Sequence, residues 1–207
     1  MFSGGGGSMS DHYYSRTQNV ESDPKYWNTE LRDTKLRFKT DNGVFSKNDV
    51  DFGTRLLVDT FQMPELPGDI LDVGCGYGPI GLTIAKTWQD RKLFMVDVNS
   101  RALALAKDNA SLNTLDNVFI KESDCLSSVI EQKFAVILTN PPIRAGKSVI
   151  YTIYEQSYEC LLPNGELWVV IQKKQGASST LDKLSSMFGE VEVVAKKKGY
   201  FIIKAIK

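Results

Sequence analysis

The sequence has few of the residues that mark several common classes of protein. Among its 207 residues are one histidine, His12, and three cysteines, Cys75, Cys125 and Cys160, which lie far apart and form no Cys-x-x-Cys pair. Such a sparse, odd set argues against a zinc site or a disulfide framework and indicates a reducing compartment. We therefore expect a cytoplasmic protein that binds no metal and uses no histidine-based mechanism.

The chain also lacks an excess charge and a long apolar run. Lys and Arg together number 25, as do Asp and Glu, so the formal net charge is zero. No overall field therefore draws the protein toward nucleic acid or a membrane, and only local clusters could do so. No apolar stretch approaches the roughly 20 residues that span a bilayer.

The length predicts one domain with a full hydrophobic core. Residues 1–8, with four consecutive glycines, are typical of a vector-derived linker, and Met9 is the expected natural start. We assign residues 9–207 to the single domain. Within it, 9–64 are expected to form an N-terminal arm, a hairpin and a helix, and 65–207 the ligand-binding core.

The N-terminal part carries a turn signal and a helix start. Residues 11–28 are polar and aromatic and predict an arm. Alternation over 31–45, with Asp41-Asn42-Gly43 as the turn, predicts a hairpin. Asn48 or Asp49 is expected to cap the following helix. The side chains expected on its buried side are Leu56, Leu57 and Phe61.

Beyond Gly68, short β-rich apolar runs alternate with helical stretches. The runs lie at 70–73, 93–98, 117–120, 134–139 and 166–171; the helical stretches lie at 80–88, 101–112, 126–131, 148–161 and 179–188. Two closing runs, 191–195 and 200–206, predict an antiparallel hairpin. This alternation predicts an α/β fold: a doubly wound, seven-stranded, mostly parallel sheet with an antiparallel strand at one edge.

A glycine-rich turn, Gly74-Cys75-Gly76-Tyr77-Gly78, directly follows the first run of this core. In an open α/β sheet, ligands bind beyond the carboxyl ends of the strands. Gly74 and Gly76 have no Cβ, so the backbone can turn sharply and approach a ligand closely. Pro79 breaks the dinucleotide-binding fingerprint, which disfavours a dehydrogenase.

One acidic residue, Asp97, ends the second run, and another, Asp124, follows the third. Asp97 lies about twenty residues past the glycines, where a carboxylate can accept hydrogen bonds from both ribose hydroxyls. It could equally cap the next helix, although Asn99 is the better candidate for that cap. Asp124 could accept from an adenine amino group while the Cys125 N–H meets a ring nitrogen. An adenosyl group without phosphates satisfies all these positions, which predicts S-adenosylmethionine as cofactor. The residues predicted to bind it are Asp72, Gly74, Cys75, Gly76, Asp97, Val98, Asp124, Cys125 and Asn140.

Asn140-Pro141-Pro142 follows the fourth run and is the predicted catalytic segment. The Asn140 side-chain oxygen and the Pro141 carbonyl can hold both hydrogens of a planar amine and free the nitrogen lone pair for methyl transfer. The prolines keep this backbone extended, so both acceptors are aimed in advance. Positioning of this kind can be worth up to about 7–11 kcal/mol and needs no strong base.

These segments resemble the class I S-adenosylmethionine-dependent methyltransferases, and more narrowly the small-domain group that includes ribosomal RNA small-subunit methyltransferase C, which methylates guanine N2. The discriminating segments are Gly43-Val44-Phe45-Ser46 and Asp51-Phe52-Gly53-Thr54. The resemblance implies a guanine-N2 methyltransferase acting on ribosomal RNA or the small ribosomal subunit. The sequence departs from this group at Ile143, where many amino-methyltransferases have an aromatic residue that stacks on the base. Either Phe45 or Tyr151 is expected to stack on the base instead, or the stacking is expected to be weaker.

Basic residues close to the catalytic segment are the expected RNA contacts. Arg144 and Lys147, with Phe45, are predicted to bind substrate, whereas the lysines at 196–198 are expected to be plain surface at the far end. Two enzyme alternatives stay open: adenine-N6 methylation, which Asn140 would support equally well, and glutamine-N5 methylation. A third alternative is an RNA-binding assembly factor that has kept the fold without catalysis.

Overall fold

The computed structural model describes residues 21–44 and 49–207. The expected linker at 1–8, most of the expected arm, His12, Phe45 and Asn48 lie outside these residues.

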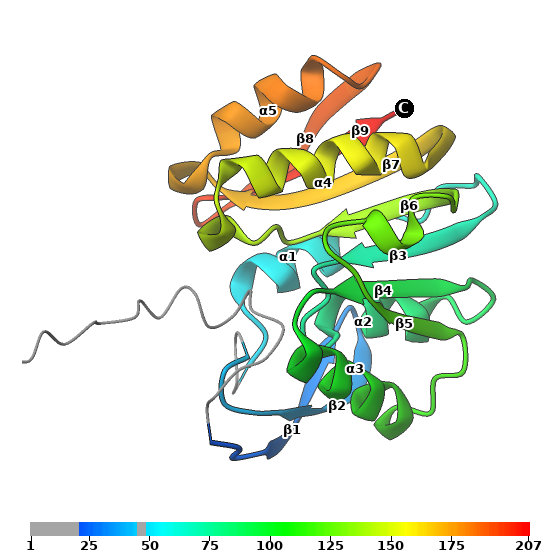
Figure 1. Cartoon of the computed structure of the whole chain (residues 1–207), viewed down its shortest axis with the longest axis vertical. Coiled ribbons are helices and arrows are strands. Elements are labelled where there is room, and N and C mark those ends of the chain that lie inside the picture. Colours follow the sequence, from blue (N-terminus) through cyan, green and yellow to red (C-terminus); the bar gives the residue numbers. More distant parts are fainter. Residues whose placement is uncertain (1–20, 45–48) are drawn as a thin grey trace, which may run out of the picture.

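A seven-stranded sheet forms the centre of the protein (Figure 1). Its strand order is β5-β4-β3-β6-β7-β9-β8. Neighbouring strands pair in parallel from β5 to β7, whereas β9 is antiparallel to both β7 and β8. The strands are β3 (Asp69–Val73), β4 (Leu93–Asp97), β5 (Val118–Glu122), β6 (Phe134–Thr139), β7 (Leu161–Gln172), β8 (Glu190–Lys197) and β9 (Tyr200–Ile206). The predicted doubly wound sheet is confirmed.

Helices cover both faces of this sheet. Helices α1 (Phe52–Thr60), α2 (Pro79–Thr87) and α3 (Ser100–Leu112) share one face, and α4 (Lys147–Cys160) and α5 (Ala177–Ser185) share the other. Three short 3₁₀ turns complete the core: η1 (Ser127–Val129), η2 (Ile143–Ala145) and η3 (Lys173–Gln175). The helical stretch expected at 126–131 is only the single turn η1.

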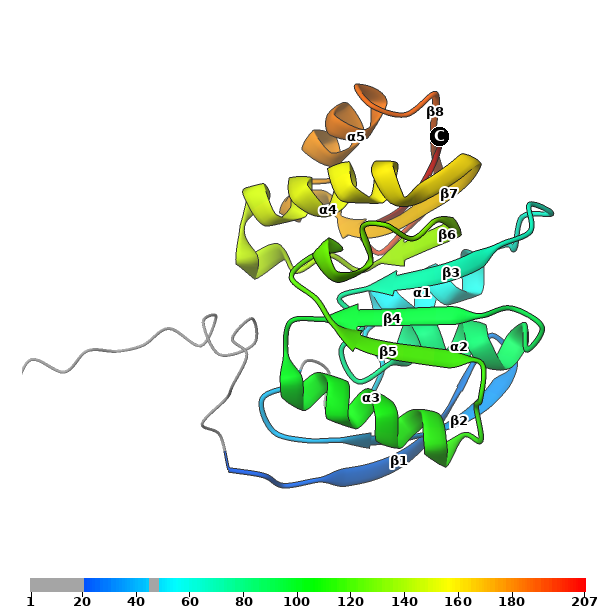
Figure 2. The ribbon, with the colours of Figure 1, turned by 45° about the vertical axis from the view of Figure 1, so that its right-hand side comes forward.

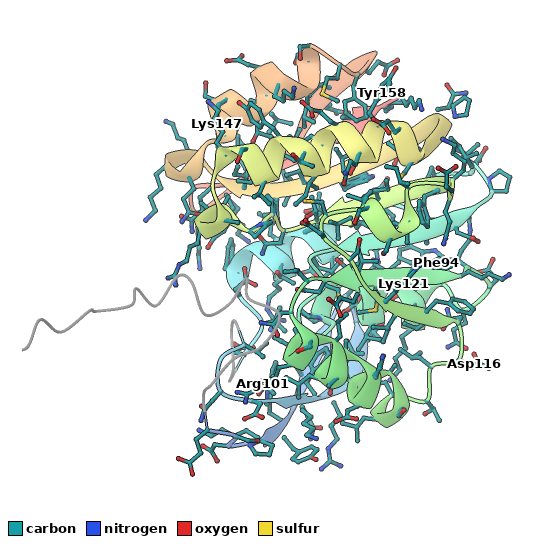
Figure 3. The ribbon with its side chains drawn as sticks, viewed as in Figure 1. Phe94, Arg101, Asp116, Lys121, Lys147 and Tyr158 are labelled. Atoms are coloured by element: carbon teal, nitrogen blue, oxygen red, sulfur yellow. The ribbon has the colours of Figure 1, made fainter. Side chains whose placement is uncertain are left out.

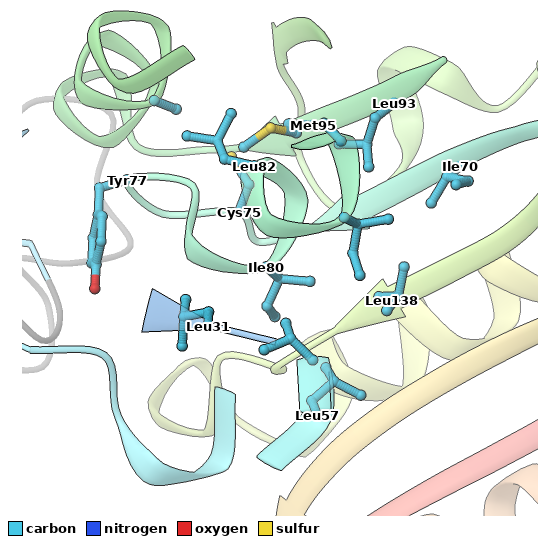
Figure 4. Packing of buried hydrophobic residues seen from close by; sticks show 14 of the residues in the cluster. Leu31, Leu57, Ile70, Cys75, Tyr77, Ile80, Leu82, Leu93, Met95 and Leu138 are labelled. Carbon is cyan, nitrogen blue, oxygen red and sulfur yellow. The ribbon is translucent and has the colours of Figure 1, made fainter. Parts of the chain in front are cut away.

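Each face has its own apolar core, because β6 is buried along its whole length and contributes side chains to both layers. Leu57 of α1 and Ile80 of α2 lie with Leu138 of β6 in one core, as Figure 4 shows. Ile137 and the fully buried Tyr154 of α4 belong to the other. In the described residues no helix is both long enough and apolar enough to cross a membrane.

The N-terminal hairpin turns earlier than the sequence predicted. Strands β1 (Lys25–Leu31) and β2 (Thr34–Thr40) pair antiparallel, and Arg32 and Asp33, both at positive φ, form the turn between them. The turn predicted at Asp41-Asn42-Gly43 is therefore wrong. Asp41 instead follows β2 directly, and its carboxylate accepts from the backbone N–H groups of Asp23 and Asn42.

Helix α1 begins later than expected. Its N-cap is Asp51, whose carboxylate accepts from the backbone N–H of Thr54 at 3.1 Å, so the predicted cap at Asn48 or Asp49 is wrong. A carboxylate three residues before that N–H has the usual capping geometry. Leu57 and Phe61 are buried as predicted, whereas Leu56 is only half-buried.

The hairpin lies beside α3, as Figure 2 shows, and two asparagines of α3 bind it. Asn109 accepts from the Lys39 N–H and donates to the Lys39 carbonyl, and Asn113 does the same for Arg37. Their spacing of four residues places both amides on one side of the helix. They therefore complete the outer edge of β2 as a neighbouring strand would.

Candidate functional site

Strands β3 and β6 bring the two predicted segments together. Val73 and Thr139, the last residues of these strands, are register partners. The buried Thr139 hydroxyl donates to the Val73 carbonyl at 2.9 Å and ties the two strand ends. Gly74 and Asn140 therefore leave the sheet side by side at its carboxyl edge.

The glycine turn leaves space in front of the sheet. Gly74 has φ +71°, and a Cβ built there would meet no atom within 4 Å in the described structure. Gly76 has φ +56° and Gly78 has φ +107°, and Pro79 then begins α2. Left-handed backbone at these three alternate positions favours glycine, because L side chains are strained there. The turn thus presents bare backbone to whatever lies before it.

Asp72 carries a buried carboxylate oxygen with an unfilled hydrogen-bonding capacity among the described residues. Its Oδ2 accepts from the Gly81 N–H at 2.9 Å, whereas Oδ1 has no partner among the described residues. Burial, and then the nearby negative charge of Asp97, raise the pKa of Asp72 to about 7. A cationic group placed here would favour the charged carboxylate. This orphaned oxygen fits a ligand that carries an ammonium group.

Asp97 is held by the backbone around it. Its two oxygens accept from the N–H groups of Gly76 at 2.8 Å and Asn99 at 2.9 Å. Burial raises the pKa of Asp97, and these hydrogen bonds partly offset that rise. Asn99, not Asp97, caps α3, because its side chain accepts from the Ala102 N–H at 3.0 Å. Asp97 is therefore free of the capping role.

The loops after β4 and β5 carry the remaining predicted cofactor residues. Val98 is half-buried directly after β4, and Asp124 is exposed after β5. Cys125 follows in a left-handed conformation, φ +50°. Both loops lie at the carboxyl edge, since Asp97 and Glu122 are register partners. The structure thus brings these residues to the edge from which Gly74 emerges.

Asn140 has a partner that the sequence did not indicate. Its amide nitrogen donates to the Thr54 hydroxyl oxygen at 3.1 Å, across 86 residues of chain. Among the described residues, no donor is bound to the Asn140 side-chain oxygen or to the Pro141 carbonyl, whereas the Pro142 carbonyl accepts from Ala145. The two acceptors predicted to hold an amine are therefore the two that remain open.

The predicted substrate contacts follow Asn140 directly. Arg144 in η2 and Lys147 at the start of α4 are both exposed, and Figure 3 labels Lys147 at that end of the helix. The Lys147 ammonium lies 5.3 Å from the ring centroid of Tyr151, and Lys183 contacts the same ring. Tyr151 is thus engaged within the layer of α4 and α5, while Phe45 lies outside the described residues.

The lysines at 196–198 do not lie at the far end. Strand β9 begins at Tyr200, which pairs with Gln172 at the carboxyl end of β7. The β8–β9 turn is therefore at the same edge as Asn140, and the prediction of a distant surface is wrong. The reversed direction of β9 places its start, rather than its end, at this edge.

In the described residues, no group of His, Cys, Asp and Glu side chains could hold a metal ion.

The fold and the site together define a class I methyltransferase: a doubly wound sheet with β9 inserted antiparallel, and a glycine turn beside Asn-Pro-Pro. The chain belongs to the methyltransferase small domain family, whose model matches residues 35–204.

Relatives support this assignment. The chain is 56% identical over 200 residues to the uncharacterized protein YbxB of Bacillus subtilis, covering 96% of this chain and all of that protein. It is 34% identical over 167 residues to ribosomal RNA small subunit methyltransferase C of Actinobacillus pleuropneumoniae serotype 3, covering 78% of this chain and 49% of that protein. The chain thus spans about half the length of the rRNA methyltransferases that it matches.

Solved structures share the fold. The 16S rRNA N2 methyltransferase of T. thermophilus, solved with AdoMet and guanosine, superposes with a TM-score of 0.79 at 22% identity. The match covers 89% of this chain and 50% of that one. TYW2 of M. jannaschii, solved with AdoMet, gives a TM-score of 0.62 at 16% identity over 90% of this chain and 87% of that one.

Proposed function

We propose that this protein uses S-adenosylmethionine to methylate the exocyclic N2 amine of a guanine in ribosomal RNA, free or within the small ribosomal subunit. The observation that carries the proposal is the pairing of Val73 with Thr139, which sets the glycine turn beside Asn140. The family match and the similarity to rRNA small-subunit methyltransferases support the substrate class.

The residues at the carboxyl edge suit the cofactor. Gly74 leaves room for it, and the Asp72 Oδ1 can accept from its ammonium group. Asp97 oxygens each keep a second lone pair for a ribose hydroxyl. Bound here, the cofactor supplies an electrophilic methyl carbon on a sulfonium. The remaining contacts that we assign to it are Cys75, Gly76, Val98, Asp124, Cys125 and Asn140.

Asn140 and Pro141 would position the acceptor amine. The nitrogen of a guanine N2 amine is a poor nucleophile because its lone pair is delocalised into the ring. The Asn140 side-chain oxygen and the Pro141 carbonyl can each accept one of its hydrogens and draw the nitrogen toward tetrahedral geometry. The Thr54 hydroxyl oxygen accepts a hydrogen bond from the Asn140 amide nitrogen and so fixes the orientation of the Asn140 side chain. On transfer the bond from the sulfonium sulfur to the methyl carbon would break and leave a neutral thioether, and the amine would lose one proton to water after or during this step.

The test has two parts. Mass-spectrometric mapping of ribosomal RNA from cells with and without the gene should show one guanine whose N2 methyl group depends on the gene. Purified Asn140→Ala should lose transfer of a tritiated methyl group to that RNA while its cofactor affinity stays within a few-fold of wild type. Near-normal transfer by this variant would remove Asn140 from the mechanism.

Adenine N6 is the second candidate, because Asn140 and Pro141 would hold that amine equally well. Mapping distinguishes the two directly, since the methyl group would then appear on adenine. Normal cofactor binding without transfer to any RNA would instead indicate a binding or assembly factor.

A further inference from the structure

Five lysines gather where β7 ends and β8 turns into β9. Lys173 and Lys174 lie in η3, and Lys196, Lys197 and Lys198 lie at the end of β8 and in the turn. All five are exposed. The Lys173 N–H donates to the Gly199 carbonyl at 2.8 Å, which joins the two segments into one surface. We call these five residues the lysine edge.

The stretches of chain immediately around the lysine edge contain no acidic residue, the nearest in β8 being Glu192. Neither 167–181 nor 193–207 contains Asp or Glu. None of the five lysines forms an ion pair within the part of the chain that the structure describes. The described lysines that do form ion pairs are Lys25, Lys39, Lys183 and Lys204. In a protein of zero net charge, five unneutralised ammonium groups form a local cationic surface.

A short series of contacts connects this edge to Asn140. The Lys198 ammonium lies 4.8 Å from the ring centroid of Phe52, the first residue of α1. The ring of Phe52 in turn lies 5.6 Å from that of Tyr200. Two residues further along α1, Thr54 takes the hydrogen bond from Asn140. The lysine edge therefore borders the catalytic segment, with two half-buried aromatic rings between them.

Gly53 allows the start of β9 to pack closely against the start of α1. A Cβ on Gly53 would come within 2.6 Å of Tyr200 Cε1 and 3.2 Å of Val170 Cγ2. Because Gly53 has no side chain, Tyr200 lies directly on the backbone of α1. The start of β9 and the start of α1 are thus packed against each other, one residue away from Thr54.

We propose that the lysine edge binds the phosphates of an unpaired RNA strand that leads the target base to Asn140. This inference rests on the proposed function. Ammonium groups bind successive phosphates of the backbone, and aromatic rings beside them stack on unpaired bases. Proteins that recognise single-stranded RNA combine these two features. Arg144 and Lys147 flank Asn140 on the side of η2 and α4, so the strand would cross the site between two cationic groups.

The experiment compares two triple variants of the full-length chain. Lys196, Lys197 and Lys198 are each replaced by Gln in the first. In the matched control, Lys92, Lys107 and Lys133, which are also exposed, are each replaced by Gln. Lys92 and Lys133 precede β4 and β6, at the opposite edge of the sheet. Calorimetric binding of S-adenosylmethionine, expected to be unchanged in both, shows that each variant is folded.

Binding of a fluorescein-labelled, unstructured RNA oligonucleotide is then measured by anisotropy over a range of salt. We expect the first variant to bind about tenfold more weakly at low salt. Its slope of log affinity against log salt should fall by about two, at about 0.7 per lost phosphate contact on a single strand. The control should match wild type in both affinity and slope.

The remaining outcomes separate the two proposals. If the first variant bound RNA as wild type does, the lysine edge would not contact phosphates. If it bound RNA normally but was no longer retained on purified small ribosomal subunits, the edge would contact a ribosomal protein, which overturns the assignment to RNA. If wild type itself bound no RNA and methylated none, the proposed function would be wrong, and the inference about the lysine edge, which rests on it, would be wrong with it.

Discussion

The amide nitrogen of Asn140 donates a hydrogen bond of 3.1 Å to the hydroxyl oxygen of the buried Thr54. This bond fixes which end of the amide faces outward, because an asparagine amide that rotates by half a turn exchanges its donor and its acceptor. Thr54 is itself held in place, since its N–H is bound by the Asp51 cap of α1. The cap of α1 and the amide proposed to be catalytic are thus joined through one residue.

Thr54→Val should lower kcat because it removes this acceptor while keeping the side chain's shape. A neutral hydrogen bond contributes about 1 kcal/mol, so the expected loss is about fivefold in kcat. Affinity for S-adenosylmethionine should stay within about twofold of wild type. Steady-state transfer to ribosomal RNA and calorimetric cofactor binding measure the two quantities.

Thr54→Ser is the matched control, since it keeps the hydroxyl and should restore most of the lost kcat. Equal activity of the Val and Ser variants would show that Thr54 contributes only to packing.

Gly74→Ala should weaken cofactor binding by more than tenfold, because its methyl group would enter the space before the turn. Gly199→Ala is a control with nearly the same backbone: φ is +79° there against +71° at Gly74, and in both cases a Cβ would meet no described atom within 4 Å. Each change carries the same left-handed strain, about 1–2 kcal/mol. The two melting temperatures should therefore fall together while cofactor affinity falls only in Gly74→Ala. Unchanged calorimetric affinity in that variant would contradict a site at the turn.

The sequence predicted the sheet and its ligand edge because both depend on local signals. Short apolar runs alternating with amphipathic stretches define a parallel sheet, and glycines or acids just after a strand mark its carboxyl edge. Asn99 was also predictable as a cap, since its position before an apolar helix is a local pattern.

Contacts between distant segments were not predictable in this way. The bond from Asn140 to Thr54 spans 86 residues, and no periodicity reports it. The position of Lys198 depends on the direction of β9. The antiparallel direction was predicted, but we did not predict that it places the β8–β9 turn at the carboxyl edge of the sheet. The hairpin was misplaced because Asp41-Asn42-Gly43 carries a stronger turn signal than Arg32-Asp33, and the pairing of β1 with β2 decides between them.

Asn109→Ala should destabilise the protein by about 2–3 kcal/mol. The side chain is fully buried, and it bonds the N–H and the carbonyl of Lys39 as well as the Tyr77 carbonyl. Its removal leaves these backbone groups unpaired at the edge of β2, at a cost of about 1–3 kcal/mol for each one that stays dry. Urea denaturation measures the loss, and Lys107→Ala, exposed on the same helix, should cost less than about 0.5 kcal/mol. Equal stability of the two variants would mean that the hairpin does not depend on α3.

Asp72→Asn should remove a pH dependence of stability. The folded protein holds the pKa of Asp72 near 7, above its ordinary value of 3.8, because the carboxyl is buried. Between these values the folded state keeps a proton that the unfolded chain has released, so the unfolding free energy falls as pH rises through this window.

Wild type should therefore lose up to about 4 kcal/mol relative to Asp72→Asn between about pH 4 and about pH 8, at about 1.4 kcal/mol for each unit of pKa. Urea denaturation at both values measures this difference, and the neighbouring Asp97 is retained in both proteins. Asp124 is an exposed carboxylate at the same edge, and the Asp124→Asn variant should show the same change in unfolding free energy with pH as wild type. Binding of S-adenosylmethionine below about pH 7 should release a proton in wild type only, because the ligand's ammonium group favours the charged Asp72. Calorimetry in two buffers of different ionisation enthalpy detects that proton, and its absence would place the ammonium group away from Asp72.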